Sequence, residues 1–317
     1  MPTYSKTLLT EQSRLLGFLT APFEKMIRLS EILRFLNESD ELRESLAIKG
    51  GTAINLTVFE LPRLSVDIDL DFTENLTKED TRIKRENISE RLELYMAAEG
   101  YTKHSKSKST YILDSSVYSY LNVAGNSDNI KVEINYSLRS HVLPTVTTTV
   151  QTAEVFAPFT VRTLAPVEIF ASKIVALSDR AAARDLYDLN NMVCFKLFEE
   201  PDLIMMRKCA TFYMAVAGVI ATNGFNFLSI ENITPYKIRT ELQPMIRNAE
   251  RFDLQAARDR VSAFLLEHMT LTEKETAFLK EFSAGRYEPK LLFDDGEIIK
   301  RIENHPMALW RQQHIRG

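Results

Sequence analysis

The chain has 317 residues, of which 45% are hydrophobic and 26% charged, and its formal net charge is −4. This length exceeds one ordinary core, so two domains are expected, and the negative charge argues against a protein that coats nucleic acid nonspecifically, although it permits a local basic surface. No apolar run approaches the ~20 residues of a membrane span, and residues 1–14 lack the apolar core of a secretory signal.

The two cysteines, Cys194 and Cys209, stand in apolar stretches without CxxC or metal-like histidine spacing. They are predicted to be buried structural thiols. Together with the missing signal, this usage indicates a reducing, cytoplasmic location and no membrane association.

The first half of the chain mixes helices with strands. Residues 5–45 have apolar residues at helical spacing, and a Gly-Gly-Thr turn at 50–52 leads into a short helix at 53–59. Residues 63–72 alternate strictly between polar and apolar, which predicts a half-buried strand. A charged helix is expected over 77–100 and ends at a glycine.

Further strands are expected near 108–123 and 130–138, joined by a turn-rich segment, and again within 142–163. From Pro166 to about residue 287 nearly every segment is typical of a helix. We therefore expect a first domain over 1–160 and a helical second domain over 161–317.

Two carboxylates project from one face of the strand at 63–72. Asp67 and Asp69 are two residues apart, so they share a face, and Asp71 continues it. Paired hard oxygen ligands suit Mg²⁺ that bridges nucleotide phosphates. The alternative interpretation is the polar side of an edge strand.

The glycine turn favours the metal interpretation. Gly50 and Gly51 leave backbone N–H groups open to a phosphate, and Thr52 is expected to start a helix, with its hydroxyl capping it or touching phosphate. A plain strand-to-helix turn is the alternative. A glycine turn, one helix and then an acidic strand together describe a phosphate cradle that faces a metal-binding strand.

A third acid stands on another strand. Glu133 lies on the polar side of the alternating segment at 131–136. It is predicted either to complete the metal site or to activate an incoming hydroxyl, with a simple exposed strand acid as the alternative.

Charged residues also line the helical stretch at 168–189. On a continuous helix, Arg180, Arg184 and Asp188 fall within roughly 60° of Lys173, whereas Asp185 falls roughly 120° away. The stretch therefore predicts one polar stripe that excludes Asp185. A solvated stripe with an Arg184–Asp188 ion pair is the alternative.

A basic segment precedes the second strand. Lys103, Lys106 and Lys108 alternate without an intervening acid. If the segment is a strand, Lys106 and Lys108 share a side and offer a surface for RNA phosphates. A solvated loop is the alternative.

Together these motifs resemble the AbiEii/AbiGii nucleotidyltransferase toxins, which are related to the MenT toxins. The resemblance rests on Gly50-Gly51-Thr52, Arg63-x-Ser65-x-Asp67-Ile68-Asp69-Leu70, Lys173-x-x-Ala176-Leu177-x-x-Arg180, Arg184-Asp185-Leu186-Tyr187-Asp188-Leu189, and a tail from Leu291-Leu292-Phe293 to His305-Pro306-Met307-x-x-Trp310. It spans most of the chain.

The resemblance implies an α/β (α+β) fold with a polymerase-β-like nucleotidyltransferase core and a helical C-terminal domain. It implies a nucleoside triphosphate (NTP) as substrate and Mg²⁺, with two ions expected. By motif, the implied nucleotide contacts are Gly50, Gly51, Thr52, Ser65, Lys173 and Arg180, the metal ligands are Asp67 and Asp69, and the last essential acid is Asp188, for which Asp185 competes.

The resemblance also implies a toxin of a bacterial toxin–antitoxin and abortive-infection system, hence a role in antiviral defence. The expected reaction adds nucleotides to the 3′ end of tRNA and stops translation. The expected antitoxin is encoded nearby and acts without a stable complex. Two rival functions stay open: a nucleotidyltransferase that modifies a protein or small molecule, and a GTP-binding regulator without transfer activity.

Overall fold

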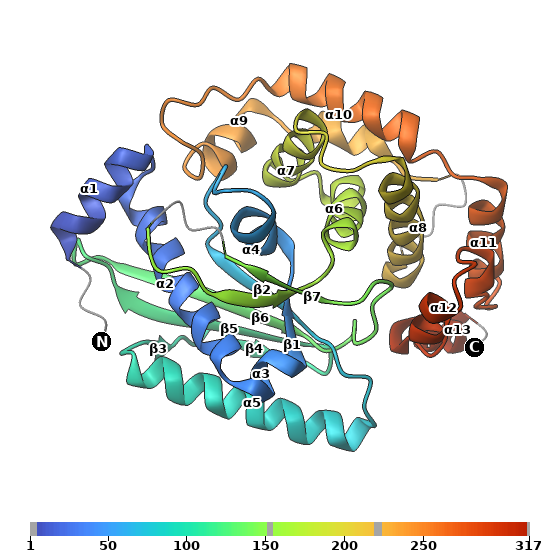
Figure 1. The fold of residues 1–317 in the computed structure, drawn as a ribbon, viewed down its shortest axis with the longest axis horizontal. Coiled ribbons are helices and arrows are strands. Elements are labelled where there is room, and N and C mark those ends of the chain that lie inside the picture. The colour runs from blue at the N-terminus through green and yellow to red at the C-terminus, as the bar shows by residue number, and fades with distance from the viewer. Residues whose placement is uncertain (1–4, 151–154, 219–223, 316–317) are drawn as a thin grey trace. The chain divides into compact units, whose positions relative to one another are not determined.

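The computed structural model describes residues 5–150, 155–218 and 224–315 (Figure 1). The chain divides into two compact units. The sheet unit comprises Met1–Arg139, Val146–Thr163 and Pro244–Glu250, and the helical unit comprises Ser140–Thr145, Leu164–Gln243 and Arg251–Gly317. The main division therefore follows Thr163. Two short segments are exceptions: Ser140–Thr145 precedes the division but belongs to the helical unit, and Pro244–Glu250 follows it but belongs to the sheet unit.

The sheet unit is built on a mixed β-sheet with the strand order β3-β5-β6-β2-β1-β8-β7, and β4 also pairs with β5. Two of the pairings, β2 with β6 and β1 with β8, are parallel, and the others are antiparallel. The strands are β1 Leu46–Ile48, β2 Asp67–Phe72, β3 Thr102–Lys103, β4 Lys108–Ser109, β5 Leu113–Leu121, β6 Ser127–Asn135, β7 Val146–Thr149 and β8 Thr160–Thr163.

Most expected elements of the first half are confirmed, with shifted ends. The acidic strand begins at Asp67 rather than at residue 63, because the backbone of residues 63–64 pairs with a distant segment, Met245–Ile246. The helices of this unit are α1 Lys6–Leu16, α2 Thr20–Glu38, α3 Asp40–Ser45, α4 Gly50–Ala53 with its π-helical continuation Ile54–Val58, and α5 Lys78–Ala98. The Thr77 side chain accepts a hydrogen bond from the N–H of Asp80 and so starts α5.

The two faces of the sheet differ in cover and in chemistry. Residues in register on neighbouring strands share a face, so Leu70, Ile134 and Asp114 lie on one face, and Asp69, Glu133 and Ser115 lie on the other. The first face is covered by helices, since Arg85 of α5 binds Asp114 and Arg28 of α2 lies over the Tyr120 ring. Figure 1 shows α5 beneath the sheet and α4 above it. We call the two sides the helix-covered face and the acid face.

The described part of the helical unit contains α6 Pro166–Arg180, α7 Ala183–Cys194, α8 Glu200–Ala217, α9 Pro235–Lys237, α10 Leu254–His268, α11 Glu273–Ser283, α12 Gly296–Ile302 and α13 Pro306–Ile315, with short 3₁₀ or π-helical turns at Phe227–Asn232, Ile238–Leu242 and Pro289–Leu291. Glu168 of α6 is fully buried and accepts hydrogen bonds from the N–H groups of Val142 (2.7 Å) and Leu143 (3.1 Å). This carboxylate therefore holds Ser140–Thr145 in the helical unit.

Two further expectations meet the structure here. Cys209 is buried, but Cys194 is exposed, because it ends α7 at the surface; its prediction as a buried thiol was wrong. None of the helices in the described ranges combines the length and apolar composition that crossing a membrane requires.

Candidate functional site

The acid face brings together the carboxylates expected from the sequence. Asp67 and Asp69 are half-buried on β2, and their register partners on β6 are Lys131 and Glu133. Lys131 Nζ lies 2.7 Å from Glu133 Oε2. Three acids and one lysine thus occupy two adjacent rows of the same face, beside the beginning of α4.

The turn before α4 closes against this acidic strand. Gly50 has a left-handed backbone with φ of +66°, and a Cβ placed on it would lie 2.8 Å from Asp69 Oδ2. The Lys49 N–H donates to the carbonyl of Asp69 at 2.9 Å. Only glycine satisfies both the φ angle and the close approach, so the turn and the carboxylate form one local structure.

Thr52 ties the same turn to the start of β2. Its hydroxyl lies 2.9 Å from that of Ser65 and donates to the carbonyl of Asp67. Both Thr52 and Ser65 are buried. The expectation that Thr52 starts the helix was wrong, because α4 begins at Gly50. Of the two expected uses of its hydroxyl, the structure has no helix cap, since the hydroxyl holds the turn to the strand, and contact with phosphate stays a prediction.

Asp71 continues the face of Asp67 and Asp69, in register with Asn135, but unlike them it is buried. It is 1% exposed, and its Oδ1 lies 2.5 Å from Lys49 Nζ. Burial raises the pKa of Asp71, and the ammonium of Lys49 opposes this shift. The pair connects β2 to the residue that precedes the glycine turn, and Asp71 is therefore a structural acid.

The donor set on the acid face fits a hard divalent cation. Asp67 and Asp69 offer carboxylate oxygens from one face, and a side chain on Gly50 would fill the space beside Asp69. Among the residues that the structure describes, no three His, Cys, Asp or Glu side chains form a ready-made metal site. Glu133 as a third ligand therefore stays a prediction.

The helical unit holds a second charged cluster. Lys173 Nζ lies 2.5 Å from Asp185 Oδ1 and 3.0 Å from Asp188 Oδ2, and Arg180 Nη2 lies 2.9 Å from Asp185 Oδ2. Lys173 and both aspartates are buried, whereas the Arg180 side chain is 62% exposed. Burial alone raises the pKa of Asp185, but the charges of Lys173 and Arg180 outweigh it and hold this pKa below its usual value.

The continuous helix expected over residues 168–189 was wrong. Helix α6 ends at Arg180, Ala181 takes a left-handed backbone with φ of 48°, and α7 begins at Ala183. The break turns Asp185 and Asp188, three residues apart on α7, back onto Lys173. The helix-face argument that separated them therefore fails. Lys173 and Asp188 are buried, whereas Arg180 is exposed, so the stripe is solvated only in part.

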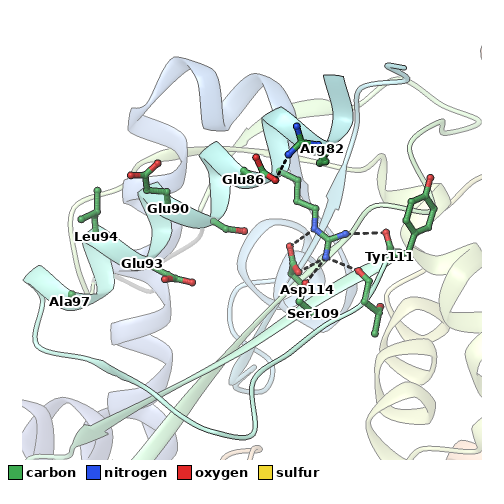
Figure 2. Close-up of a pocket in the computed structure, with 12 residues that line it drawn as sticks. Arg82, Glu86, Glu90, Glu93, Leu94, Ala97, Ser109, Tyr111 and Asp114 are labelled. Atoms are coloured by element: carbon green, nitrogen blue, oxygen red, sulfur yellow. Dashed lines mark hydrogen bonds and ion pairs between the residues drawn. The ribbon is translucent and has the colours of Figure 1, made fainter. Parts of the chain in front are cut away.

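A cavity of about 840 Å³ lies elsewhere on the sheet unit, between α5 and the strands β4 and β5 (Figure 2). Asp114 holds the guanidinium of Arg85 there, at 2.9 Å from Nε, and Ser109 Oγ accepts from Nη2 at 2.8 Å. Because Asp114 belongs to the helix-covered face, this cavity is on the side of the sheet opposite Asp67 and Asp69.

The profile of one protein family matches residues 34–285, and its description is "Nucleotidyl transferase AbiEii toxin, Type IV TA system". The chain belongs to this AbiEii family. It is therefore a nucleotidyltransferase toxin of a type IV toxin–antitoxin system. The matched range includes both the glycine turn with its acidic strand and the Lys173 cluster.

A solved structure and the curated proteins give two further comparisons. The fold is similar to that of MenT4, a nucleotidyltransferase toxin from Mycobacterium tuberculosis, with a TM-score of 0.65 and 16% identity over 96% of this chain and 99% of that one. No curated protein matches the sequence. The likeness to MenT4 extends the mixed α/β fold over nearly the whole AbiEii chain.

Sequence reasoning missed two members of the acid-face region in this AbiEii protein. Lys131 stands next to Asp67 in register, and Lys49 neutralises Asp71. The alternation Lys131-x-Glu133 indicates that both share a face, but the partner strand is not visible in the sequence. The Lys49–Asp71 pair joins β2 to the residue between β1 and α4 and has no local signal.

We predict that Asp185→Asn and Asp188→Asn both impair nucleotidyl transfer, the first mainly by lowering stability and the second mainly by lowering the activity of the folded protein. Asp185→Asn removes the carboxylate charge that two cations share, so it should lower stability more, by about 2 kcal/mol. Asp188→Asn should lose more activity per folded molecule, if Asp188 is the essential acid that the sequence resemblance implies. Thermal unfolding and transfer rates, measured on the same proteins, separate the two effects. A stable but inactive Asp185→Asn protein would show that Asp185, and not Asp188, is the essential acid.

Proposed function

We propose that this AbiEii toxin is a Mg²⁺-dependent nucleotidyltransferase with a polymerase-β-like core, and that it transfers a nucleotide from an NTP to the 3′ end of tRNA. The observation that carries the proposal is the closure of the Gly50 turn against Asp69. It places a backbone suited to phosphate beside a pair of carboxylates suited to a cation.

In this proposal the residues of the sheet unit hold the triphosphate. The backbone at Gly50, Gly51 and Thr52 faces phosphate, because the first N–H groups of a helix have no partner within it. The Ser65 hydroxyl fixes the turn through Thr52. Asp67 and Asp69, with Glu133 as a third acid, hold the cation, which when bound stabilises charge on the attacking and leaving oxygens.

The helical unit contributes the remaining family motif. We assign Lys173 and Arg180 to charge neutralisation on the triphosphate, and Asp188 to the last essential acid. The two aspartates hold the ammonium of Lys173 in a fixed position. In the reaction, the acceptor hydroxyl gives up its proton to water and its oxygen forms a bond to the α-phosphorus, while the bond from that phosphorus to the bridging oxygen breaks and pyrophosphate leaves.

The biological proposal follows from the family. Modification of the tRNA 3′ end blocks charging and stops translation, which accounts for toxicity in abortive infection. The cognate antitoxin is proposed to counteract the toxin without forming a stable complex with it.

The test is incubation with total tRNA and each labelled triphosphate in turn. Transfer of label to RNA, with release of pyrophosphate, supports the proposal. Label that enters a protein or small molecule instead indicates the other acceptor class. Binding of GTP without pyrophosphate release indicates a regulator that has lost transfer.

The basic segment at residues 103–108 allows a test of RNA binding in which one lysine of the segment serves as the control for another. Lys108 pairs in register with Ser115, so it lies on the acid face, whereas Lys103 pairs with Tyr118 and contacts Glu93 on the helix-covered face. The expected single strand is interrupted by a turn at Lys106. We predict that Lys108→Ser weakens RNA transfer and reduces its salt dependence, each phosphate contact accounting for a slope of about 0.7–0.9.

Lys103→Ser is the matched control and should leave the salt dependence of transfer unchanged. NTP affinity should stay constant in both variants. The measurement is the transfer rate as a function of salt concentration. Equal slopes for Lys108→Ser and the wild type remove this lysine from the RNA surface.

A further inference from the structure

Arg63 is a charged residue that lies wholly inside the sheet unit. It is 1% exposed and belongs to the largest fully buried side chains of the protein. Its Nη1 donates to the carbonyl of Leu64 at 3.0 Å. The family motif contains this arginine, but none of the roles assigned above uses it.

The loop that carries Arg63 is held from behind by a distant segment of the chain. Arg63 forms a β-bridge with Ile246, and the Leu64 N–H donates to the carbonyl of Met245 at 2.7 Å. Ile246 is itself fully buried. Because the backbone of Arg63 is held and its side chain is enclosed, the guanidinium cannot move out into solvent to make room for a neighbouring side chain.

This guanidinium stands against the glycine turn. A Cβ built on Gly51 would lie 2.7 Å from Arg63 Nη2 and 3.4 Å from Ser65 Oγ. Unlike Gly50, Gly51 has no left-handed φ, so its backbone accepts any residue. The obstacle to a side chain at position 51 is therefore Arg63, and not backbone strain.

We propose that Arg63 is a positioning residue for the nucleotide: it fixes the Gly-Gly-Thr turn by filling the space behind Gly51, and it places a permanent positive charge against that turn. A guanidinium stays charged at all physiological pH values, and its field is weakly screened inside a protein. The turn is thereby shaped and biased for an anion. The phosphate as that anion rests on the proposed function; the steric part does not.

The steric part is tested by a double-mutant cycle that reads thermal unfolding and binding of a labelled NTP. Gly51→Ala alone is expected to lower the NTP affinity about tenfold and to lower the unfolding temperature, as overpacking does. Adding Arg63→Lys, whose slimmer head vacates the Nη2 position, should restore most of the unfolding temperature. Gly50→Ala is the matched control and should not be rescued, because φ and Asp69 forbid it.

The charge is tested by comparing Arg63→Lys with Arg63→Met in the Gly51 background. Arg63→Met should raise the KM for NTP about tenfold while the KM for RNA stays constant, and Arg63→Lys should retain most of the affinity. A role limited to folding would change both KM values little and reduce only the amount of active protein, which overturns the charge assignment.

The cycle also distinguishes its own failure from that of the proposed function. If transfer to RNA is never observed but Arg63→Lys restores the unfolding temperature of Gly51→Ala, the steric inference stands and tRNA is the wrong acceptor. The inference is overturned, whatever the acceptor, if Gly51→Ala changes neither the unfolding temperature nor the NTP affinity. It is also overturned if Gly51→Ala lowers both equally in the wild type and in Arg63→Lys.

Discussion

Asp69→Asn is expected to abolish nucleotidyl transfer while leaving the unfolding temperature almost unchanged. The side chain is half-buried on the acid face, and in the proposed function it offers oxygen ligands to the cation rather than packing in the core. A cation at such a site contributes several kcal/mol to catalysis, and about 1.4 kcal/mol is a factor of ten, so a loss of about a thousandfold or more is expected. Asp67→Asn should behave alike.

The readout that does not depend on activity is metal binding. Mg²⁺ should raise the unfolding temperature of the wild type, and this increase should disappear in Asp69→Asn. Asp128→Asn is a suitable control, since Asp128 belongs to the same sheet but pairs with Lys25 at 2.7 Å. A folded Asp69→Asn protein that keeps both transfer and the Mg²⁺ effect contradicts the assignment of β2.

Lys173→Met is expected to be the most destabilising single substitution in the helical unit. It removes the ammonium that both buried aspartates share, and Asp185 keeps only the charge of the exposed Arg180 beside it among these three ion pairs. Removing one partner from a buried ionic cluster typically costs about 3–5 kcal/mol. Denaturant unfolding of the isolated protein measures this cost, and transfer activity should be lost as well.

The pH dependence of this loss has a definite sign. The pKa of Asp185 is lowered in the folded protein, so its pairing stabilises above the ordinary value of 3.8 and is lost as the pH falls through the lowered pKa. Without Lys173, burial penalises the ionised carboxylate of Asp185 more strongly than in the wild type, and this penalty disappears as Asp185 becomes protonated. The stability difference between wild type and Lys173→Met should therefore be large near neutral pH and shrink in acid.

Arg180→Met serves as the control, because its side chain is 62% exposed and solvent screens its contribution. It should change stability little. A stability difference for Lys173→Met that stays constant down to acidic pH indicates that packing, and not charge, dominates the cluster.

Local patterns predicted much of this molecule, because they depend on neighbours in the sequence. The alternation in β2 predicted that Asp67 and Asp69 share a face, and the glycine pair predicted a tight turn. The helical periods and the glycine after α5 predicted that helix well.

Other features depend on contacts that no local pattern encodes. The sequence around the break at Ala181 contains neither glycine nor proline, the residues that usually indicate a helix end, so one helix was predicted where α6 and α7 are separate. The burial of Asp71 depends on Lys49, which precedes the glycine turn. The late start of the acidic strand depends on Met245, which lies far from it in the sequence.

The segment Pro244–Glu250 has a consequence for how the toxin is made. It belongs to the sheet unit, yet the ribosome synthesises it after most of the helical unit. Its backbone completes the loop of Arg63 and Leu64. A nascent chain therefore lacks the backbone that holds this loop until synthesis has passed residue 250, so the proposed nucleotide site is completed only late in synthesis.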